Sequence, residues 1–309
     1  MIDLSIVVPV YRASATIGEL CRRLVEVVEA QGSSFEIVFV EDCGGDDSWQ
    51  LIQTLAADDQ RVRGFRMHRN YGQHNALLAG IRGARGKVIA TLDDDLQHPP
   101  EELPKLLGKL DGDCDVVYGA PQSQQHSALR GIASQITKTI LQRSMGVEAA
   151  RDMSAFRVFR TELREAFRDF NSPSVNIDVL LTWATSRFAV VRVRHQSRNH
   201  GGSGYGAAKL VGHAMNMVTG FTTIPLKLAS IIGFLFAAFG LLILAYVVLR
   251  YAYSGGSVPG FPFLASIVAI FSGAQLIAIG IIGEYLARMY QGLMGRPAYL
   301  LRETTPPGL

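Results

Sequence analysis

The chain of 309 residues has few cysteines, and charge of neither sign dominates it. Its cysteines, Cys21, Cys43 and Cys114, are far apart and form no C-x-x-C pair. This argues against a disulfide framework or a zinc site and fits a reducing compartment. The 30 lysines and arginines nearly balance 27 aspartates and glutamates, so the net charge of +3 shows no basic stripe. The sequence therefore predicts no nucleic-acid partner.

The N-terminus also lacks a basic segment followed by a cleavable apolar stretch, because MIDLSIVVPVYR carries an acidic residue at position 3. We therefore expect no signal peptide and a cytoplasmic start of the chain. Charged residues make up only 18% of the sequence, against 48% hydrophobic residues. That balance is too apolar for an ordinary soluble protein of this size, and it excludes disorder as the dominant state.

The apolar excess lies in two uncharged runs near the C-terminus, at residues 228–249 and 261–283. A helix of 22 residues is about 33 Å long, which is enough to cross the hydrocarbon core of a bilayer. The runs predict a hairpin domain at 225–290 with spans at about 226–250 and 261–286, in preference to two buried core helices. Basic residues flank the open side of this hairpin, so the positive-inside rule predicts that both chain ends are cytoplasmic.

The first two hundred residues alternate apolar, β-branched runs with segments of helical spacing. This pattern predicts strands at 4–10, 35–40, 62–67 and 87–92, and helices at 16–30, 47–57, 73–83 and from residue 99. Continuous apolar strands separated by helices indicate an α/β domain whose mostly parallel sheet is covered on both faces. Ligands of such sheets bind at the carboxyl ends of the strands, so the polar residues after each strand are the candidates for a site.

The most informative of these segments is LDDDLQHPPEELP at 92–104, which ends a strand with three carboxylates and starts a helix at Pro-Pro-Glu-Glu. If the chain stays extended here, Asp93, Asp95 and Gln97 lie on one side and Asp94 on the other. Carboxylate and amide oxygens suit Mg²⁺ or Mn²⁺ shared with substrate phosphates. The alternative is a solvated acidic loop that caps the next helix. The strand before the acids and the helix after them favour the metal site.

Two further aspartates are candidate site residues, and the sequence supports Asp42 more strongly than Asp152. Asp42 follows the second predicted strand, where its carboxylate suits hydrogen bonds from a nucleobase or a ribose, although it could instead cap the next helix. Asp152 in RDMSAFRVF, taken alone, is an ordinary loop aspartate.

Two amphipathic segments, 127–145 and 207–224, combine an apolar helical stripe with basic neighbours, as helices in the headgroup plane of a membrane do. For the first segment, packing on the domain core is an equal alternative. The second leads directly into a membrane span, which favours the interface. Between them, a glycine-rich loop carries Arg198, His200, Ser203 and Tyr205, whose donors could close over a phosphate.

In this order, the motifs resemble the family 2 glycosyltransferases of GT-A fold that act on polyprenyl phosphates. That family includes dolichyl-phosphate mannose synthase and the bacterial undecaprenyl-phosphate glucosyl and aminoarabinose transferases. The resemblance rests on VVPVY at 7–11, Asp42, RNYGQH at 69–74, the acidic segment at 92–104, D-x-S-x-F-R at 152–157, R-x-x-G-x-S-x-Y at 198–205, and GAQLIAIGIIGEYLARMY at 273–290.

The resemblance implies inverting, metal-dependent transfer from a nucleotide-diphosphate sugar, with UDP as the expected nucleotide, to polyprenyl (undecaprenyl) phosphate. It also implies a homotetramer in the bacterial inner membrane. Carried over residue by residue, Pro9, Tyr11, Asp42, Asp93, Asp94 and Arg198 would bind the nucleotide sugar. Asp93, Asp95 and Gln97 would hold Mg²⁺ or Mn²⁺; Arg130, Arg143, Ser203 and Tyr205 would bind the lipid phosphate; and Asp152, Asp95 and Arg157 would be catalytic.

Four positions depart from the family pattern: Arg12-Ala13 replaces Asn-Glu, Asp94 replaces a common alanine, and Gly204 replaces a lysine or arginine. The expected organisation is a GT-A domain at 1–206, a juxtamembrane helix at 207–224, the hairpin, and a cytoplasmic tail at 291–309. A processive polysaccharide synthase is disfavoured because Q-x-x-R-W is missing and only two spans are predicted. The non-enzymatic alternative is an inactive membrane-anchored nucleotide-sugar-binding protein or flippase subunit.

Overall fold

The computed structural model describes residues 2–110, 112–122, 153–172, 175–196, 223–254 and 260–306. The chain forms two compact units. One contains Met1–Gly204 together with Gly295–Leu309, and the other contains Tyr205–Met294. The predicted amphipathic segment at 127–145 lies outside the described residues, as does 207–224 except for its last two positions.

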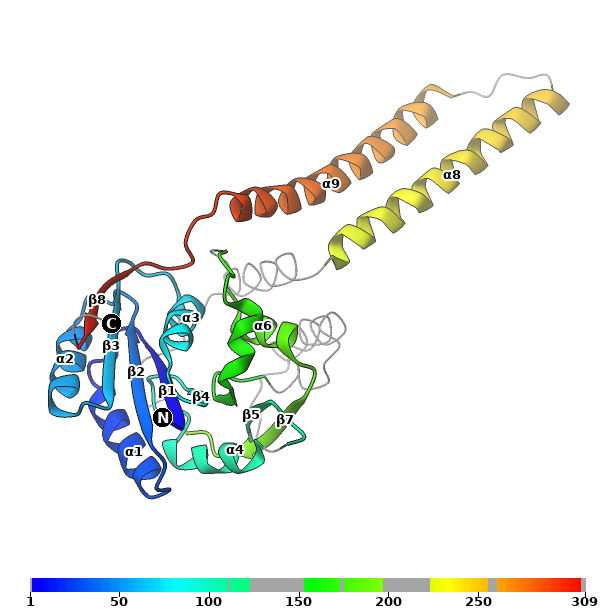
Figure 1. Ribbon diagram of the computed structural model, residues 1–309. Helices are drawn as coiled ribbons and strands as arrows, with labels where there is room; N and C mark the ends of the chain where they lie inside the picture. Colours follow the sequence, from blue (N-terminus) through cyan, green and yellow to red (C-terminus); the bar gives the residue numbers. More distant parts are fainter. Residues whose placement is uncertain are drawn as a thin grey trace. The chain divides into compact units, whose positions relative to one another are not determined.

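The first unit is built on one mixed sheet of eight strands, in the order β7-β5-β6-β4-β1-β2-β3-β8 (Figure 1). The strands are β1 (Leu4–Val10), β2 (Phe35–Glu41), β3 (Val62–Met67), β4 (Val88–Thr91), β5 (Val116–Pro121), β6 (Arg157–Arg160), β7 (Phe188–Val193) and β8 (Leu301–Thr305). The neighbours β4-β1-β2-β3 are parallel, as are β5 and β7, whereas β6 and β8 run antiparallel to their neighbours. The predicted α/β class with a mostly parallel sheet is confirmed.

Helices cover both faces of this sheet, and they begin and end within one residue of the predicted bounds for the first three. They are α1 (Ile17–Glu29), α2 (Ser48–Asp58), α3 (Gln73–Gly83), α4 (Leu103–Lys109) and α6 (Ile177–Ala184), with 3₁₀ turns at Pro100–Glu102 and Thr161–Phe167. The α1 side chains that are buried recur at helical spacing, so one stripe of this helix faces the sheet.

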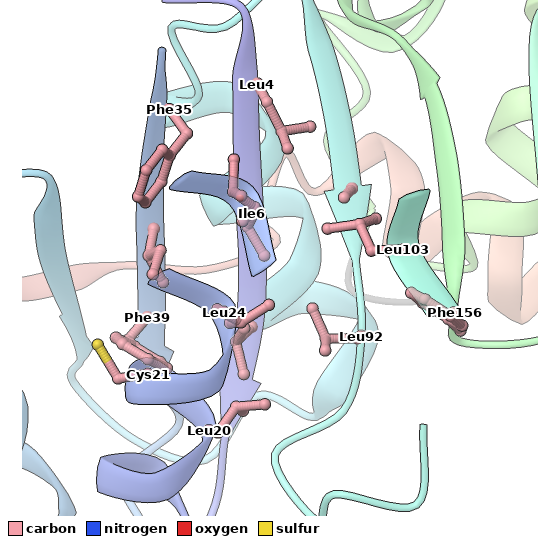
Figure 2. Packing of buried hydrophobic residues seen from close by; sticks show 14 of the residues in the cluster. Leu4, Ile6, Leu20, Cys21, Leu24, Phe35, Phe39, Leu92, Leu103 and Phe156 are labelled. Carbon is pink, nitrogen blue, oxygen red and sulfur yellow. The ribbon is translucent and has the colours of Figure 1, made fainter. Parts of the chain in front are cut away.

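The two faces of β1 enter two different hydrophobic clusters. Ile6 and Val8 belong to the cluster under α1, together with Leu20 and Leu24 (Figure 2), and Val7 belongs to the cluster under α3. Side chains of a strand alternate between faces, so a continuous apolar strand is required when both faces are buried. Each fully buried leucine or isoleucine stabilises the fold by about 1.5–3 kcal/mol.

Helix α3 approaches the sheet closely at Gly80. A Cβ atom placed there would lie 2.3 Å from Val7 Cγ1 and 3.0 Å from Val40 Cγ2, on the neighbouring strands β1 and β2. The helix therefore needs glycine at this position to pack at its observed distance. Helix α3 begins at Gln73, within the RNYGQH segment.

Strand β8 gives the C-terminal tail a structure that the sequence prediction of a plain tail did not include. It pairs antiparallel with β3, as Figure 1 shows at the red end of the chain. The Trp49 indole N–H also donates to Glu303 Oε2 at 3.0 Å, across 254 positions of sequence. The chain thus returns to the sheet after the second long helix.

The second unit contains two long helices, α8 (Ile224–Ser254) and α9 (Phe261–Leu293). Stretches of 27 and 24 residues in them are long and apolar enough to cross a membrane, and Ala229 is the one buried residue among the described residues of these stretches. The helices contact each other through Phe236 and Phe271, whose rings are 5.4 Å apart and edge to face. The prediction of two C-terminal spans is confirmed by length and composition.

Candidate active site

The loops that follow β1 and β4 are joined by a carboxylate. The backbone N–H of Tyr11, the first residue after β1, donates to Asp94 Oδ2 at 3.0 Å. The side chain of Tyr11 is 45% exposed, and its ring lies 5.3 Å from the guanidinium carbon of Arg12. Pro9, the third predicted nucleoside contact, is buried within β1 opposite Val40. These strand ends therefore form one edge of the sheet, as predicted.

Asp42 follows β2 and holds the RNYGQH segment in place. Its two carboxylate oxygens accept the backbone N–H groups of Tyr71 at 2.7 Å and of Gly72 at 2.8 Å. Gly72 has a φ of +94°, a conformation that glycine adopts without steric cost. The Asp42 side chain is buried, and burial raises the pKa of this carboxyl, against the effect of the two N–H donors. A carboxylate has about four acceptor sites, so the two backbone N–H groups leave capacity for further donors. Contact of Asp42 with a nucleoside stays a prediction.

The acidic segment after β4 is a turn, so an extended chain at 93–97, the condition for placing Asp93, Asp95 and Gln97 on one side, is not met. Leu96 has a φ of +60°, and Asp95 Oδ1 accepts the backbone N–H of Gln97 at 3.1 Å. An aspartate that bonds the backbone two residues on forms such a turn by itself, which breaks the alternation of a strand. Asp93 Oδ1 accepts Gln73 Nε2 at 2.5 Å, which joins this turn to the start of α3.

Asp93, Asp95 and Gln97 nevertheless offer hard oxygen ligands on one short turn. In the described part of the chain, no group of three or more His, Cys, Asp and Glu side chains could hold a metal ion. Mg²⁺ is commonly bound by one or two carboxylates together with substrate phosphates and water. The residues present therefore fit a divalent ion that is completed by a diphosphate, and they do not fit a closed structural metal site.

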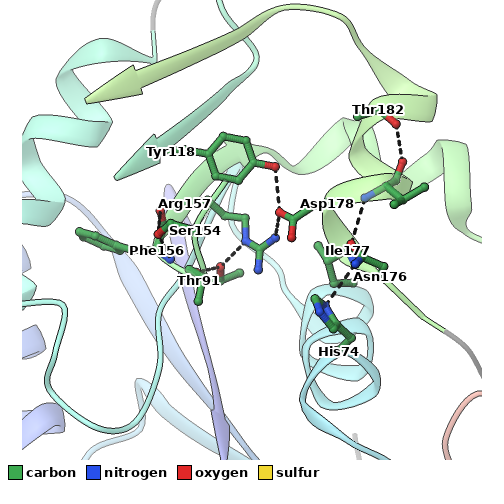
Figure 3. A network of polar contacts seen from close by, with 12 residues as sticks. His74, Thr91, Tyr118, Ser154, Phe156, Arg157, Asn176, Ile177, Asp178 and Thr182 are labelled. Atoms are coloured by element: carbon green, nitrogen blue, oxygen red, sulfur yellow. Dashed lines mark hydrogen bonds and ion pairs between the residues drawn. The ribbon is translucent and has the colours of Figure 1, made fainter. Parts of the chain in front are cut away.

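Arg157, predicted to face the reacting sugar, is the centre of a buried network (Figure 3). Its side chain is 1% exposed, it forms an ion pair with Asp178 on α6, and its Nε–H donates to Thr91 Oγ1 at 3.0 Å. The Tyr118 hydroxyl donates to the same Asp178 oxygen at 2.9 Å. Burial opposes the charge of Arg157, but Asp178, Tyr118 and Asp93 outweigh it and raise the pKa of the guanidinium.

This network lies directly behind the acidic turn, since Thr91 ends β4 and Asp93 acts electrostatically on Arg157. Burial, followed by the charge of Asp178, raises the pKa of Tyr118 well above its usual value, so its hydroxyl stays protonated as a donor. The remaining predicted site residues lie outside the described residues, and their roles stay predictions. They are Asp152 of the catalytic group, Arg198 of the nucleotide-sugar group, and Arg130, Arg143, Ser203 and Tyr205 of the lipid-phosphate group.

Sequence reasoning missed Asp178, Gln73 and a contact between the acidic turn and the end of β7. The signal for Asp178 was a carboxylate inside the apolar stretch NIDVLL. At the end of β7, the Gln196 N–H donates to the Gln97 carbonyl at 2.9 Å, and Arg194 Nε donates to the buried Glu102 at 2.7 Å. These contacts fix the segment that leads towards residue 198.

His98, in the acidic segment, also contacts the segment that follows β7. Its ring stacks on Phe156 at 5.5 Å and lies 5.0 Å from the ring of His195. Its Nδ1 has no hydrogen-bond partner among the described residues. Burial first, and then the charge of His195, lower the pKa of His98 to about 4. The imidazole is therefore neutral at physiological pH.

Comparison with known proteins identifies the family of this site. Residues 5–167, more than half of the chain, match the model of Glycosyl transferase family 2. The chain belongs to this family. It is 37% identical over 302 residues to undecaprenyl-phosphate 4-deoxy-4-formamido-L-arabinose transferase of Shewanella sediminis, covering 97% of this chain and 91% of the relative. The protein of the same name from Pseudomonas aeruginosa PAO1 is 37% identical over 315 residues, covering 100% and 93%.

Solved structures agree on the fold of this glycosyltransferase. Glucosyl-3-phosphoglycerate synthase from Mycobacterium tuberculosis, crystallised with Mn²⁺, UDP and phosphoglyceric acid, aligns with a TM-score of 0.51 at 16% identity, over 70% of this chain and 76% of that one. Its complex with Mn²⁺ and UDP-glucose aligns with a TM-score of 0.52 at 15% identity, over 70% and 77%. At such identities the likeness shows the GT-A-type fold alone, and the predicted fold class and enzyme class are both confirmed.

Proposed function

We propose that the protein transfers a sugar from a UDP-linked donor to undecaprenyl phosphate at the cytoplasmic face of the bacterial inner membrane, with inversion at the anomeric carbon. The observation that carries this proposal is the acidic turn at the carboxyl ends of β1 and β4, in a chain that also has two membrane-spanning helices. A soluble donor and a lipid acceptor require that combination. The product is a lipid-linked sugar for modification of the cell envelope.

The donor would lie along the loops after β1, β2 and β4. Tyr11, Asp42 and the buried Pro9 would bind the nucleoside, and Asp93, Asp95 and Gln97 would hold Mg²⁺ or Mn²⁺. When bound, the ion would supply positive charge to the departing diphosphate. The UDP and Mn²⁺ in the Mycobacterium tuberculosis structures of this fold support the choice of nucleotide and metal.

The acceptor needs little activation, because the second pKa of a phosphate monoester is near 6 and the dianion predominates at neutral pH. Its oxygen would attack the anomeric carbon in line with the bond to the diphosphate, which leaves with the bonding electron pair. Asp152 would orient the acceptor or act as the base. Arg130, Arg143, Arg198, Ser203 and Tyr205 would hold the phosphates, and the protein's part is positioning and charge stabilisation.

Connectivity and charge support the proposed topology. Residues before and after the hairpin belong to the same sheet, which supports a hairpin whose two ends lie on the same side of the membrane. Basic residues flank those ends, and together with the positive-inside rule they favour the cytoplasm for both termini. The homotetramer implied by the family resemblance completes the proposal.

The test is a panel of nucleotide sugars incubated with detergent-solubilised protein, a divalent metal and undecaprenyl phosphate. UDP-4-deoxy-4-formamido-L-arabinose is the first donor to test, because the full-length relatives are named for that sugar. We expect release of the nucleotide together with a lipid-linked sugar. A sugar product without lipid would contradict the acceptor, and binding of a donor without any release would favour the inactive nucleotide-sugar-binding alternative.

A further inference from the structure

Three adjacent strands place three charged residues side by side at one end of the sheet. Arg66 on β3 lies opposite Glu41 on β2 and opposite Glu303 on β8. Arg66 Nη1 is 3.1 Å from Glu303 Oε1, and Arg66 Nε is 3.4 Å from Glu41 Oε2. We refer to Glu41, Arg66 and Glu303 as the charge ladder.

The ladder ends at the loop that follows β2. Glu41 is buried, and its other oxygen, Oε1, accepts the Gly44 N–H at 2.6 Å. The Gly44 carbonyl in turn accepts Arg12 Nε–H at 3.0 Å. A Cβ on Gly44 would lie 2.7 Å from the Arg12 backbone nitrogen, so the loops after β1 and β2 are in close contact.

Both loops contain a backbone conformation that needs support. Arg12 has a φ of +56° and Cys43 a φ of +55°, and neither residue is a glycine. Such left-handed conformations are unfavourable for side-chain-bearing residues and persist where surrounding contacts fix them. Here the Glu41–Gly44 and Gly44–Arg12 bonds provide those contacts.

A second connection from the C-terminal segment reaches the third loop. The His68 N–H donates to the Leu300 carbonyl at 3.0 Å, just past the end of β3. The segment that follows His68 supplies the Tyr71 and Gly72 N–H groups that Asp42 binds. Residues 300–303 therefore contact the roots of the loops that carry the predicted nucleoside contacts.

From these contacts we infer that β8 is a positioning element for the donor site, acting through Glu303 and the charge ladder. The inference rests on the proposed function in one respect, that these loops bind the donor nucleotide. The residues of the ladder are positioning residues, because none is assigned a contact with the substrate. A segment that follows the membrane hairpin thus sets the geometry of the donor site.

The decisive variant is Glu303→Gln in the full-length protein, which removes the charge and keeps the shape. We expect the KM for the donor to rise about five-fold, the scale of a partly exposed ion pair, while kcat and the KM for undecaprenyl phosphate stay within about two-fold. Glu303→Asp should restore part of the loss. Thr304→Ser, at the next position of the same strand, is the matched control and should leave all three constants unchanged.

Hydrogen–deuterium exchange distinguishes a role of β8 in positioning the loops from a role in covering the edge of the sheet alone. In Glu303→Gln we expect faster exchange at residues 43–46 and 68–72, with β1 and β2 unchanged. Faster exchange along β3 alone, or a donor KM equal to that of Thr304→Ser, would overturn the inference. If the wild-type protein transfers no sugar at all, the proposed function fails, and the exchange pattern of the two loops still decides the role of β8.

Discussion

Asp42 and Asp94 each accept a backbone N–H from another loop of the site, and Asp95 accepts one within its own turn. Their carboxylates therefore shape the loops in which they lie, in addition to supplying charge. Replacement by alanine removes both properties at once, because the backbone N–H loses its partner when the carboxylate is deleted. Asparagine keeps one acceptor oxygen and removes the charge, so it is the more informative substitution at this edge of the sheet.

For this reason we predict that Asp95→Asn keeps the turn through its Oδ1 and weakens metal binding by about tenfold or more, with a matching loss of transfer at low metal concentration. Titration of the activity with Mn²⁺ measures the effect. The control is Asp58→Asn at the exposed end of α2. Metal dependence identical to that of the wild type would show that Asp95 is not a ligand.

Cys43 provides a reporter for the nucleoside site. It is exposed directly after Asp42, whereas Cys21 and Cys114 are buried, and burial raises the pKa of Cys21 to about 11. We predict that N-ethylmaleimide labels Cys43 first in the native protein, since reaction requires an accessible thiolate. UDP with Mn²⁺, at ten times its Kd, should slow that labelling by about tenfold. Mass spectrometry identifies the labelled residue. A labelling rate that UDP does not change would show that the nucleoside does not bind at this loop.

At the scale of elements, the sequence predicted the four βα steps because their signals are local. The strand at 62–67 and the helix at 73–83 have the predicted bounds. Strands β5, β6, β7 and β8 were not predicted, and β6 and β8 pair antiparallel with strands that are distant in sequence. The same distinction between local and distant contacts applies to the site. The position of Asp42 at a strand end could be predicted from the sequence. Its two backbone partners, and the ion pair of Arg157 with Asp178, depend on tertiary packing and could not.

Helix α3 offers a test of close packing that uses two glycines of the same chain. We predict that Gly80→Ala destabilises the protein by about 1–3 kcal/mol, because the added methyl group would overlap Val7 on β1. Gly18→Ala, in α1, meets no atom within 4 Å and should be neutral or stabilising by up to about 1 kcal/mol.

Thermal unfolding followed by tryptophan fluorescence measures both glycine variants, since Trp49 and Trp183 lie in the first unit. Equal melting temperatures for the two variants would show that the α3 contact adapts without cost.

At the scale of the whole molecule, the hairpin is an insertion between two parts of one folded unit. We predict that green fluorescent protein fused to the C-terminus fluoresces and that alkaline phosphatase fused there is inactive. Alkaline phosphatase fused after Gly256, in the segment between the spans, should be active. The reverse pattern of activities would place the sheet on the outer side of the membrane.

The pairing of β8 with β3 has a consequence for biogenesis. The ribosome makes β3 early and β8 last, and both long apolar helices emerge between them. Until β8 arrives, β3 is an unpaired edge strand, the kind of surface that recruits other chains into aggregates. Completion of the sheet therefore follows synthesis of the hairpin. A chain that ends before residue 301 would carry both long helices but would leave β3 as an unpaired edge of the sheet.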